Sequence, residues 1–150
     1  MRRRLTDAHG KIIDAIGDAM AALVDDDLPF DVGDFARHYY RNVAAEDLVA
    51  RSAEDLAGAA WSHLQFAMQR RRGRPKVRAF NPENNAAAWN STHTIVQTVN
   101  DDMPFLVDSV AMLLNAAGFT VHLTVHPILN LRRDGQGNLV ALEKEADEAA

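Results

Sequence analysis

The sequence predicts an α+β fold in which a β-α-β-β unit follows a helical N-terminal half. Three observations support this prediction. Apolar and polar residues alternate over residues 119–131, which indicates a strand. Apolar residues recur at helical spacing over residues 105–117, which indicates a helix before that strand. The turn-forming sequence Asp134-Gly135-Gln136-Gly137 then leads into the apolar run 139–142, which indicates a returning strand.

The composition is that of an ordinary globular chain. Its 150 residues are 47% hydrophobic and 25% charged, enough for a single domain with a helical extension. A formal net charge of -5 argues against a nucleic-acid partner, because phosphate binding needs an excess of Lys and Arg. The absence of cysteine excludes disulfides, thiolate chemistry and Cys-ligated zinc. No signal or transmembrane segment is recognised, so we expect no membrane partner and a cytoplasmic location.

Two amphipathic helical stretches are predicted near the N-terminus, over residues 5–24 and 29–43. The run Asp25-Asp26-Asp27 lies between them. It lacks the alternating ligands, the Gly and the Glu of a calcium loop, so a solvated linker is preferred to a cation site.

A further helix is predicted over residues 53–71. Ser52 is a natural N-cap with Asp55 three residues later, in the manner of a capping box, and an apolar stripe follows. His63 lies beside that stripe without a second ligand four residues on. A polar residue at the rim of the core is therefore preferred to a metal ligand.

The only basic cluster lies where this helix is expected to end, at Gly73-Arg74-Pro75. Its members are Arg70, Arg71, Arg72, Arg74, Lys76 and Arg78. Cations at that position offset the negative end of the helix dipole. An anion or nucleic-acid patch is the functional alternative, but no aromatic residues are interleaved with the basic ones. A short strand over residues 76–80 and an irregular loop over residues 81–89 are expected to follow.

The β-α-β-β unit begins with a strand over residues 94–100 and an acidic turn at Asp101-Asp102-Met103-Pro104. Gly118 stands where the following helix would need a C-cap. His122 and His126, on the next strand, are about 13 Å apart if the chain is extended, so they cannot share one metal.

The motifs of an active site are absent from the sequence. Asp101 and Asp102 are adjacent and point opposite ways in an extended chain, which makes a poor acid/base pair. No Gly-rich phosphate loop and no dinucleotide fingerprint occurs. We therefore assign no catalytic, cofactor-binding or metal-binding residue, and the residues indicate a regulatory or binding module.

Several motifs resemble the N-terminal region of the large bacterial NAD-specific glutamate dehydrogenases. They are Ser91-Thr92-His93-Thr94-Ile95-Val96, Asp101-Asp102-Met103-Pro104-Phe105-Leu106-Val107-Asp108-Ser109-Val110, Val121-His122-Leu123 and His126-Pro127. The resemblance implies that the chain opens a longer polypeptide that oxidises L-glutamate to 2-oxoglutarate and ammonia with NAD. It also implies that the catalytic and NAD-binding residues lie downstream of this chain.

The resemblance further implies an ACT-like (ferredoxin-like) antiparallel four-stranded sheet with helices on one face. The helix over residues 53–71 and the strand over residues 76–80 would complete it from the N-terminal side, as a circular permutation. Residues 76–80 would pair with residues 94–100, residues 139–142 would lie on the other side of 94–100, and residues 119–131 would form the far edge. Trp61, Leu64 and Met68 would then cover the same sheet face as Leu106, Val110 and Leu113. The expected layout is a helical extension over residues 1–50, an ACT-like module over residues 51–142 and a polar tail over residues 143–150.

ACT modules commonly bind an amino acid at the turn between their first strand and first helix. The matching residues here are Asn100, Asp101, Asp102, Met103, Pro104, Phe105 and Leu106. Such modules usually place Gly in that turn, whereas this sequence has Pro104-Phe105, and we expect the Phe105 side chain to fill the usual ligand position. His122 and His126 are candidate interface residues. The expected partners are the remaining domains of the same polypeptide, further copies in a homo-oligomer and an amino-acid effector; the alternative is a free-standing amino-acid-binding module.

Overall fold

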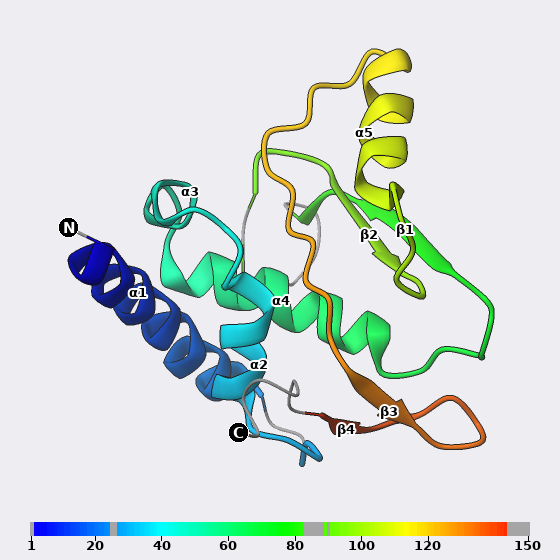
Figure 1. Ribbon diagram of the computed structural model, residues 1–150, viewed down its shortest axis with the longest axis horizontal. Helices are drawn as coiled ribbons and strands as arrows, with labels where there is room; N and C mark the ends of the chain where they lie inside the picture. The colour runs from blue at the N-terminus through cyan, green and yellow to red at the C-terminus, as the bar shows by residue number, and fades with distance from the viewer. Residues whose placement is uncertain (1, 25–26, 83–88, 90, 144–150) are drawn as a thin grey trace.

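The computed structural model describes residues 2–24, 27–82, 89 and 91–143. The predictions made for Asp25 and Asp26, for loop residues 83–88 and for tail residues 144–150 lie outside this range. Over the described ranges, four helices come first, and strands with one further helix between them follow, so the mixed helix and strand content that the sequence predicts is confirmed (Figure 1).

Helices form the N-terminal half. They are α1 (Arg2–Leu23), α2 (Val32–Tyr40), α3 (Ala45–Val49) and α4 (Ala53–Ala67). The Ser52 hydroxyl accepts a hydrogen bond from the Asp55 backbone N–H at 3.1 Å, so the predicted N-cap of α4 is confirmed. The helix ends at Ala67, before the basic residues that were predicted to extend it.

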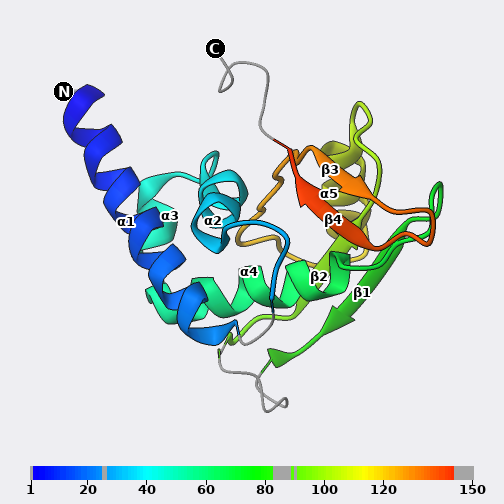
Figure 2. The ribbon, with the colours of Figure 1, turned by 90° about the horizontal axis from the view of Figure 1, so that it is seen from below.

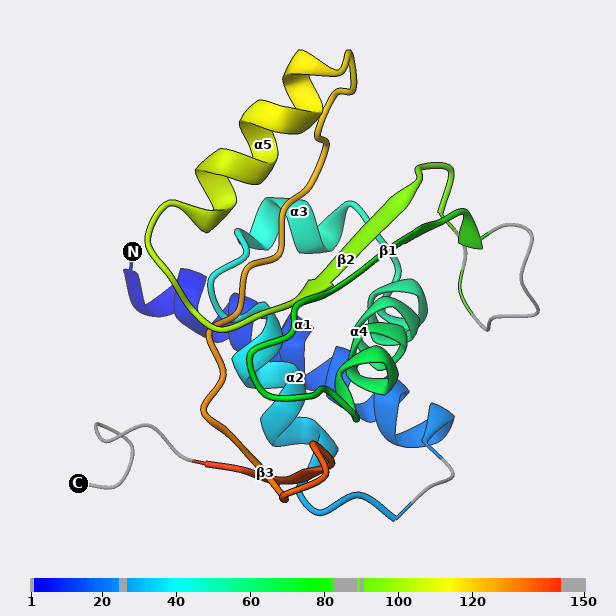
Figure 3. The ribbon, with the colours of Figure 1, turned by 90° about the vertical axis from the view of Figure 1, so that its right-hand side faces the viewer.

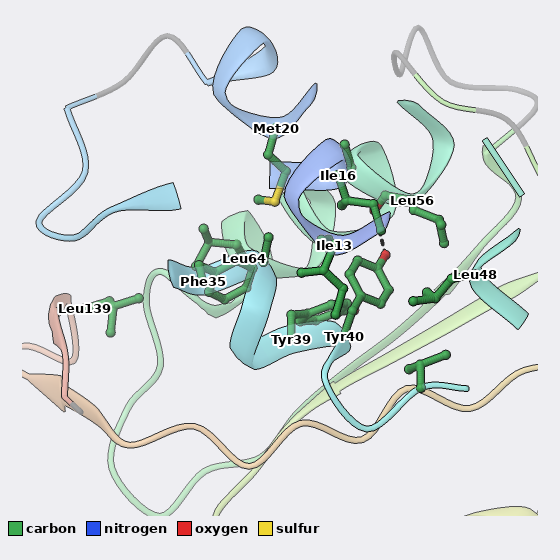
Figure 4. Close-up of a cluster of buried hydrophobic side chains, with 14 residues drawn as sticks. Ile13, Ile16, Met20, Phe35, Tyr39, Tyr40, Leu48, Leu56, Leu64 and Leu139 are labelled. Carbon is green, nitrogen blue, oxygen red and sulfur yellow. Dashed lines mark hydrogen bonds between the residues drawn. The ribbon is translucent and has the colours of Figure 1, made fainter. Parts of the chain in front are cut away.

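The main core lies between these helices. α1 packs against both α2 and α4, and Figure 2 shows α1 running across α4. The buried residues of this core are Ile13, Ile16, Met20, Phe35, Ala36, Tyr39, Tyr40, Val43, Leu48, Leu56, Ala57, Ala60, Leu64 and Leu139 (Figure 4). The one polar group of Tyr40 is satisfied inside this core, because its hydroxyl donates to the Leu56 carbonyl at 2.6 Å. Residues on both sides of the predicted boundary at residue 50 share this core, and the boundary itself stays a prediction.

Among the described residues, the strands form two separate two-stranded antiparallel sheets. β1 (Lys76–Phe80) pairs with β2 (Ile95–Val99), with Lys76 opposite Val99 and Phe80 opposite Ile95, so this predicted pairing is confirmed. β3 (Leu131–Arg133) pairs with β4 (Leu139–Leu142). Figures 1 and 3 show the two sheets apart from each other. A single four-stranded sheet and the circular permutation are not confirmed.

The predicted position of residues 139–142 beside β2 is wrong. The β3–β4 hairpin instead lies at the end of α4, where the Leu139 N–H donates to the Met68 carbonyl at 2.8 Å and the Arg70 N–H donates to the Gly137 carbonyl at 3.0 Å. Backbone groups just beyond a helix end need partners from elsewhere, and the hairpin supplies them.

Residues 119–131 were predicted to form one strand. The segment is extended, but its residues pair with no other strand before Leu131, where β3 begins. The expected alternation holds only in the second part of the segment. Leu123, Val125 and Leu129 pack against the core while Thr124, His126 and Ile128 are exposed, whereas Phe119 and Val121, predicted on the buried side, are exposed. The strand assignment was wrong because period-2 alternation reports an extended chain with one buried side and not the presence of a hydrogen-bonded neighbour.

The helix predicted before that segment is α5 (Leu106–Ala116), and none of its residues is buried. Met112 is 71% exposed and Leu113 is 70% exposed, and Figure 3 shows the helix projecting away from the rest of the fold. The prediction that Trp61, Leu64 and Met68 cover the same sheet face as Leu106, Val110 and Leu113 is not confirmed, because Leu113 is exposed whereas Trp61, Leu64 and Met68 lie in or against the helical core. Gly118 has a φ of 92°, so the predicted glycine C-cap is confirmed.

Within the described residues, no helix is both long enough and apolar enough to cross a membrane.

Candidate effector site at the turn before the fifth helix

The predicted effector turn joins β2 to α5. Asp101, Asp102, Met103, Pro104 and Phe105 are exposed, and the flanking residues Asn100 and Leu106 are half-buried. Phe105 has a φ of 64° and a ψ of 12°, which is the left-handed region that glycine enters most easily. The side chain is 77% exposed, so it fills no enclosed position within this chain, and its effect on ligand binding stays a prediction. The backbone nonetheless takes the conformation that would favour a Gly.

The turn is tied to the fold by a buried arginine. The Nη1 atom of Arg70 donates to Oδ1 of Asp101 at 3.0 Å, and the Arg70 side chain is only 9% exposed whereas that of Asp101 is 68% exposed. The hydrogen bond and the positive charge of Arg70 lower the pKa of the Asp101 carboxyl group. The turn therefore carries an exposed, ionised carboxylate that is paired with a buried guanidinium.

The rest of the Arg70 side chain is held by the backbone. Its Nε atom donates to the Arg74 carbonyl at 2.8 Å. The Nη2 atom is buried, and it has no hydrogen-bond partner in the part of the chain that the structure describes. Because buried polar atoms are nearly always paired, this donor is an exception that needs a physical explanation.

Two further cations lie beside Arg70. Arg133 donates from Nη1 to the Gly137 carbonyl at 3.0 Å, and the Arg70 backbone N–H donates to the same oxygen. Lys76 donates from Nζ to the Phe66 carbonyl at 2.6 Å and to the Gln69 carbonyl at 2.9 Å. Burial and the nearby charge of Arg70 lower the pKa of Arg133, and burial followed by the charge of Arg133 lowers that of Lys76. Among the described residues, Asp101 is the only carboxylate that forms an ion pair with this group.

The basic cluster thus has two roles, of which the sequence indicated one. Lys76 bonds carbonyl groups at the end of α4, as predicted for a cation near a helix C-terminus. The burial of Arg70 was missed, because its neighbours Asp101 and Gly137 are distant in sequence. Arg78 is also engaged with the fold, since it bonds the Gln97 side chain at 2.7 Å and lies over the Phe66 ring.

The two candidate interface histidines lie away from this turn, on the extended segment after α5. His122 and His126 are both exposed. The His122 ring stacks on that of His93, with ring centroids 4.2 Å apart and planes inclined by 21°. Within the described residues, no group of three or more His, Asp or Glu side chains could hold a metal ion.

A cleft of about 440 Å³ lies elsewhere, between α1 and α2, and is lined by Phe30, Arg37 and Glu143 among others. Arg37 pairs with Asp34 and has its Nη1 atom 3.8 Å from Oδ1 of Asp14. The charges of Arg37 are thus balanced within the protein. None of the candidate effector or interface residues named from the sequence lines this cleft, so the turn before α5 remains the candidate site.

Comparison with known proteins supports the resemblance seen in the sequence. The glutamate dehydrogenase ACT1 domain family matches residues 35–150. The NAD-specific glutamate dehydrogenase of Halomonas elongata is 37% identical over 143 residues, which cover 94% of this chain and 9% of that protein. The enzyme of the same name from Pseudomonas aeruginosa is 37% identical over 105 residues, covering 70% of this chain and 6% of that protein. No solved structure matches the chain. The chain belongs to the glutamate dehydrogenase ACT1 domain family.

Proposed function

We propose that this chain is the non-catalytic N-terminal regulatory and assembly part of a cytoplasmic NAD-dependent glutamate dehydrogenase. In this proposal the parent polypeptide oxidises L-glutamate to 2-oxoglutarate and ammonia, with NAD bound by later domains. The two relatives support it, because they carry that enzyme name and the chain spans less than a tenth of the length of either.

One observation supports the assembly role most directly, namely the uncovered apolar surface around α5. Phe105, Met112, Leu113 and Phe119 are all at least 64% exposed. Large apolar side chains exposed in this number along one helix and its two ends favour a surface that another protein segment covers, because their exposure to water is unfavourable. We propose that later domains of the polypeptide, or further copies in a homo-oligomer, cover it.

The finer points of the fold belong to the same proposal. Within the described residues, β2 pairs with β1 alone and residues 119–130 belong to no ladder, although the Thr98 carbonyl of β2 already bonds His63. A strand edge that is not fully paired accepts a further strand. We propose that the ACT-like module, residues 51–142, completes its four-stranded sheet in the assembled enzyme. His122 and His126, on the exposed side of the extended segment, are proposed to contact a partner surface there.

The test uses the full polypeptide that carries this chain. A Leu113→Glu substitution places a charge in the proposed contact, and we expect it to weaken assembly at least about tenfold, because a buried unpaired charge is unfavourable. An Asn115→Glu substitution adds the same charge at an exposed polar position of the same helix and is the control.

Mass by light scattering and glutamate-dependent NAD reduction are measured for both variants. Normal mass and activity in Leu113→Glu contradict the assembly role. Absence of glutamate-dependent NAD reduction in the unaltered polypeptide contradicts the proposed parent activity. The free-standing amino-acid-binding module is not favoured, because both relatives are far longer than this chain.

A further inference from the structure

One nitrogen of the Arg70 guanidinium, Nη2, donates no hydrogen bond to any described residue. A guanidinium carries five N–H donors in a planar fork, suited to two parallel bonds with one carboxylate. In this structure Nε is used by the Arg74 carbonyl and Nη1 by Asp101. The Nη2 donors have no partner among the described residues although the atom is buried.

The charges around Arg70 are also unbalanced. Arg133 and the Arg70 backbone share the Gly137 carbonyl, and Lys76 bonds the carbonyl of the residue before Arg70. The charge of Arg70 acts on Arg133 and the charge of Arg133 acts on Lys76, so the three cations follow one another, while Asp101 is the one carboxylate paired with Arg70 in the described part of the chain. An additional anion at this position would relieve the repulsion between the cations.

We propose that Arg70, Lys76 and Arg133 form a binding site for a carboxylate group, and that the incoming carboxylate displaces Asp101 from Arg70. This gives the effector of the proposed regulatory role a chemical class, and to that extent it rests on the proposed function. Asp101 already shows that a carboxylate oxygen can reach Nη1 of Arg70. Its own exposure of 68% opens the ion pair to solvent from the side of the turn.

The displacement has a consequence for α5. Asp101 lies four residues before Phe105, whose carbonyl accepts the first hydrogen bond of the helix from Ser109 at 2.9 Å. Phe105 is held in a left-handed conformation that a bulky residue adopts only under constraint. Release of Asp101 removes one attachment of this turn, so binding at Arg70 changes how α5 is held.

The carboxylate has two sources to distinguish, a free small molecule and an Asp or Glu side chain from the rest of the polypeptide. The experiment is hydrogen exchange with mass spectrometry on the full polypeptide, read in peptides that cover residues 67–75 and 98–106. The probe is succinate, with sodium chloride at equal ionic strength to account for screening. The Arg70→Gln variant separates an effect of succinate at this site from an effect of succinate bound elsewhere in the polypeptide.

For a free ligand we expect succinate to slow exchange in residues 67–75 and to speed it in residues 98–106. Arg70→Gln abolishes both effects, Arg70→Lys weakens them because the fork is lost, and Arg71→Gln, at an exposed position, leaves them unchanged. Asp101→Asn removes the internal competitor. It lowers the succinate concentration for half-effect on residues 67–75 by about three- to tenfold, as expected for the loss of a charged hydrogen bond.

For a side chain of the same polypeptide we expect no effect of succinate. Residues 67–75 are then already protected in the full polypeptide relative to the isolated chain, and Arg70→Gln removes that protection. No succinate effect together with equal exchange in the full polypeptide and the isolated chain overturns the proposal. If Arg70→Gln does not fold, the Asp101→Asn variant decides. A succinate concentration for half-effect that is the same as in the unaltered polypeptide overturns the proposal of a free carboxylate ligand. Glutamate-dependent NAD reduction is measured in parallel, so a failure of the proposed parent activity is seen separately from a failure of this site.

Discussion

The Tyr39 hydroxyl lies 2.8 Å from Nδ1 of His63, and the other ring nitrogen of His63 lies 2.9 Å from the Thr98 carbonyl. A carbonyl only accepts hydrogen bonds, so Nε2 carries the proton and Nδ1 accepts from Tyr39. Burial raises the pKa of Tyr39, which keeps its hydroxyl protonated and able to donate. One neutral imidazole thus connects the helical core, through α2 and α4, to β2.

This arrangement predicts a pH-dependent stability. Burial is the main cause that lowers the pKa of His63 below its usual 6.5, so the folded chain resists protonation there and the unfolded chain does not. The unfolded state then binds more protons below about pH 6.5, and the free energy of unfolding decreases as the pH falls from that value toward the folded pKa. The decrease is complete once the pH is below the folded pKa.

Urea unfolding between pH 7.5 and pH 5 measures this slope, with His63→Gln as the variant that cannot titrate and the exposed His126→Gln as control. We expect His63→Gln to lose about 1–3 kcal/mol at neutral pH, through unsatisfied buried groups, and to flatten the slope. A slope in His63→Gln as steep as in the unaltered chain would count against this explanation. Asp101 and Asp134 have pKa values lowered from 3.8, so they titrate outside this range.

Gly137 is predicted to be the most sensitive glycine of the β3–β4 turn. Its φ is 87°, and a Cβ atom there would lie 2.3 Å from the Arg70 carbonyl oxygen. We expect Gly137→Ala to destabilise the chain by about 2–4 kcal/mol, from backbone strain together with the steric clash. In contrast, a Cβ atom added at Gly135 would meet no described residue within 4 Å beyond its own chain neighbours, so Gly135→Ala serves as the control for thermal unfolding. Equal midpoints for the two alanine variants would refute the prediction.

The isolated chain is predicted to lack glutamate dehydrogenase activity and measurable affinity for NAD. Its sequence has no Gly-rich loop of the kind that binds the pyrophosphate at a helix N-terminus. Calorimetric titration of the chain with NAD checks this, with the full polypeptide as the positive control. Saturable binding at micromolar NAD would contradict it.

His122 is predicted to affect assembly more than folding. Its side chain is exposed and its described ring contact is the stack on His93, so a His122→Glu substitution should change the free energy of unfolding by no more than about 0.5 kcal/mol. In the full polypeptide the same change should reduce the mass in solution and the activity, because it adds a charge to the proposed interface. Gln65→Glu, on an exposed position of α4, is the charge-matched control. Unchanged mass and activity in His122→Glu would remove His122 from the interface.

The features predicted correctly from the sequence depend on nearby residues. The N-cap at Ser52 and the glycine at the end of α5 follow from short-range patterns, whereas the pairing of 76–80 with the next strand was expected from the family resemblance. The wrong predictions concern distant partners. The apolar residues of α5 indicate that a covering surface is needed, but they do not specify whether that surface lies within this chain.

The sequence predicted the turn of the candidate site but not the buried arginine that holds it. The motif around Asp101 indicated the turn, whereas Arg70 looked like one of several cations near a helix end. Its burial depends on Gly137 and Asp101, which approach it only after the hairpin and the turn have folded back onto α4. No spacing rule within residues 70–78 could distinguish Arg70 from Arg71, which is exposed.

The position of the core along the chain has a consequence for synthesis. Of the residues that the structure describes, every buried member of the helical core except Leu139 lies within residues 13–64. On a ribosome these residues emerge first, so the helical core can assemble before β3 and β4 have been translated. Leu139 then arrives as the last buried residue and secures the hairpin to a structure that already exists.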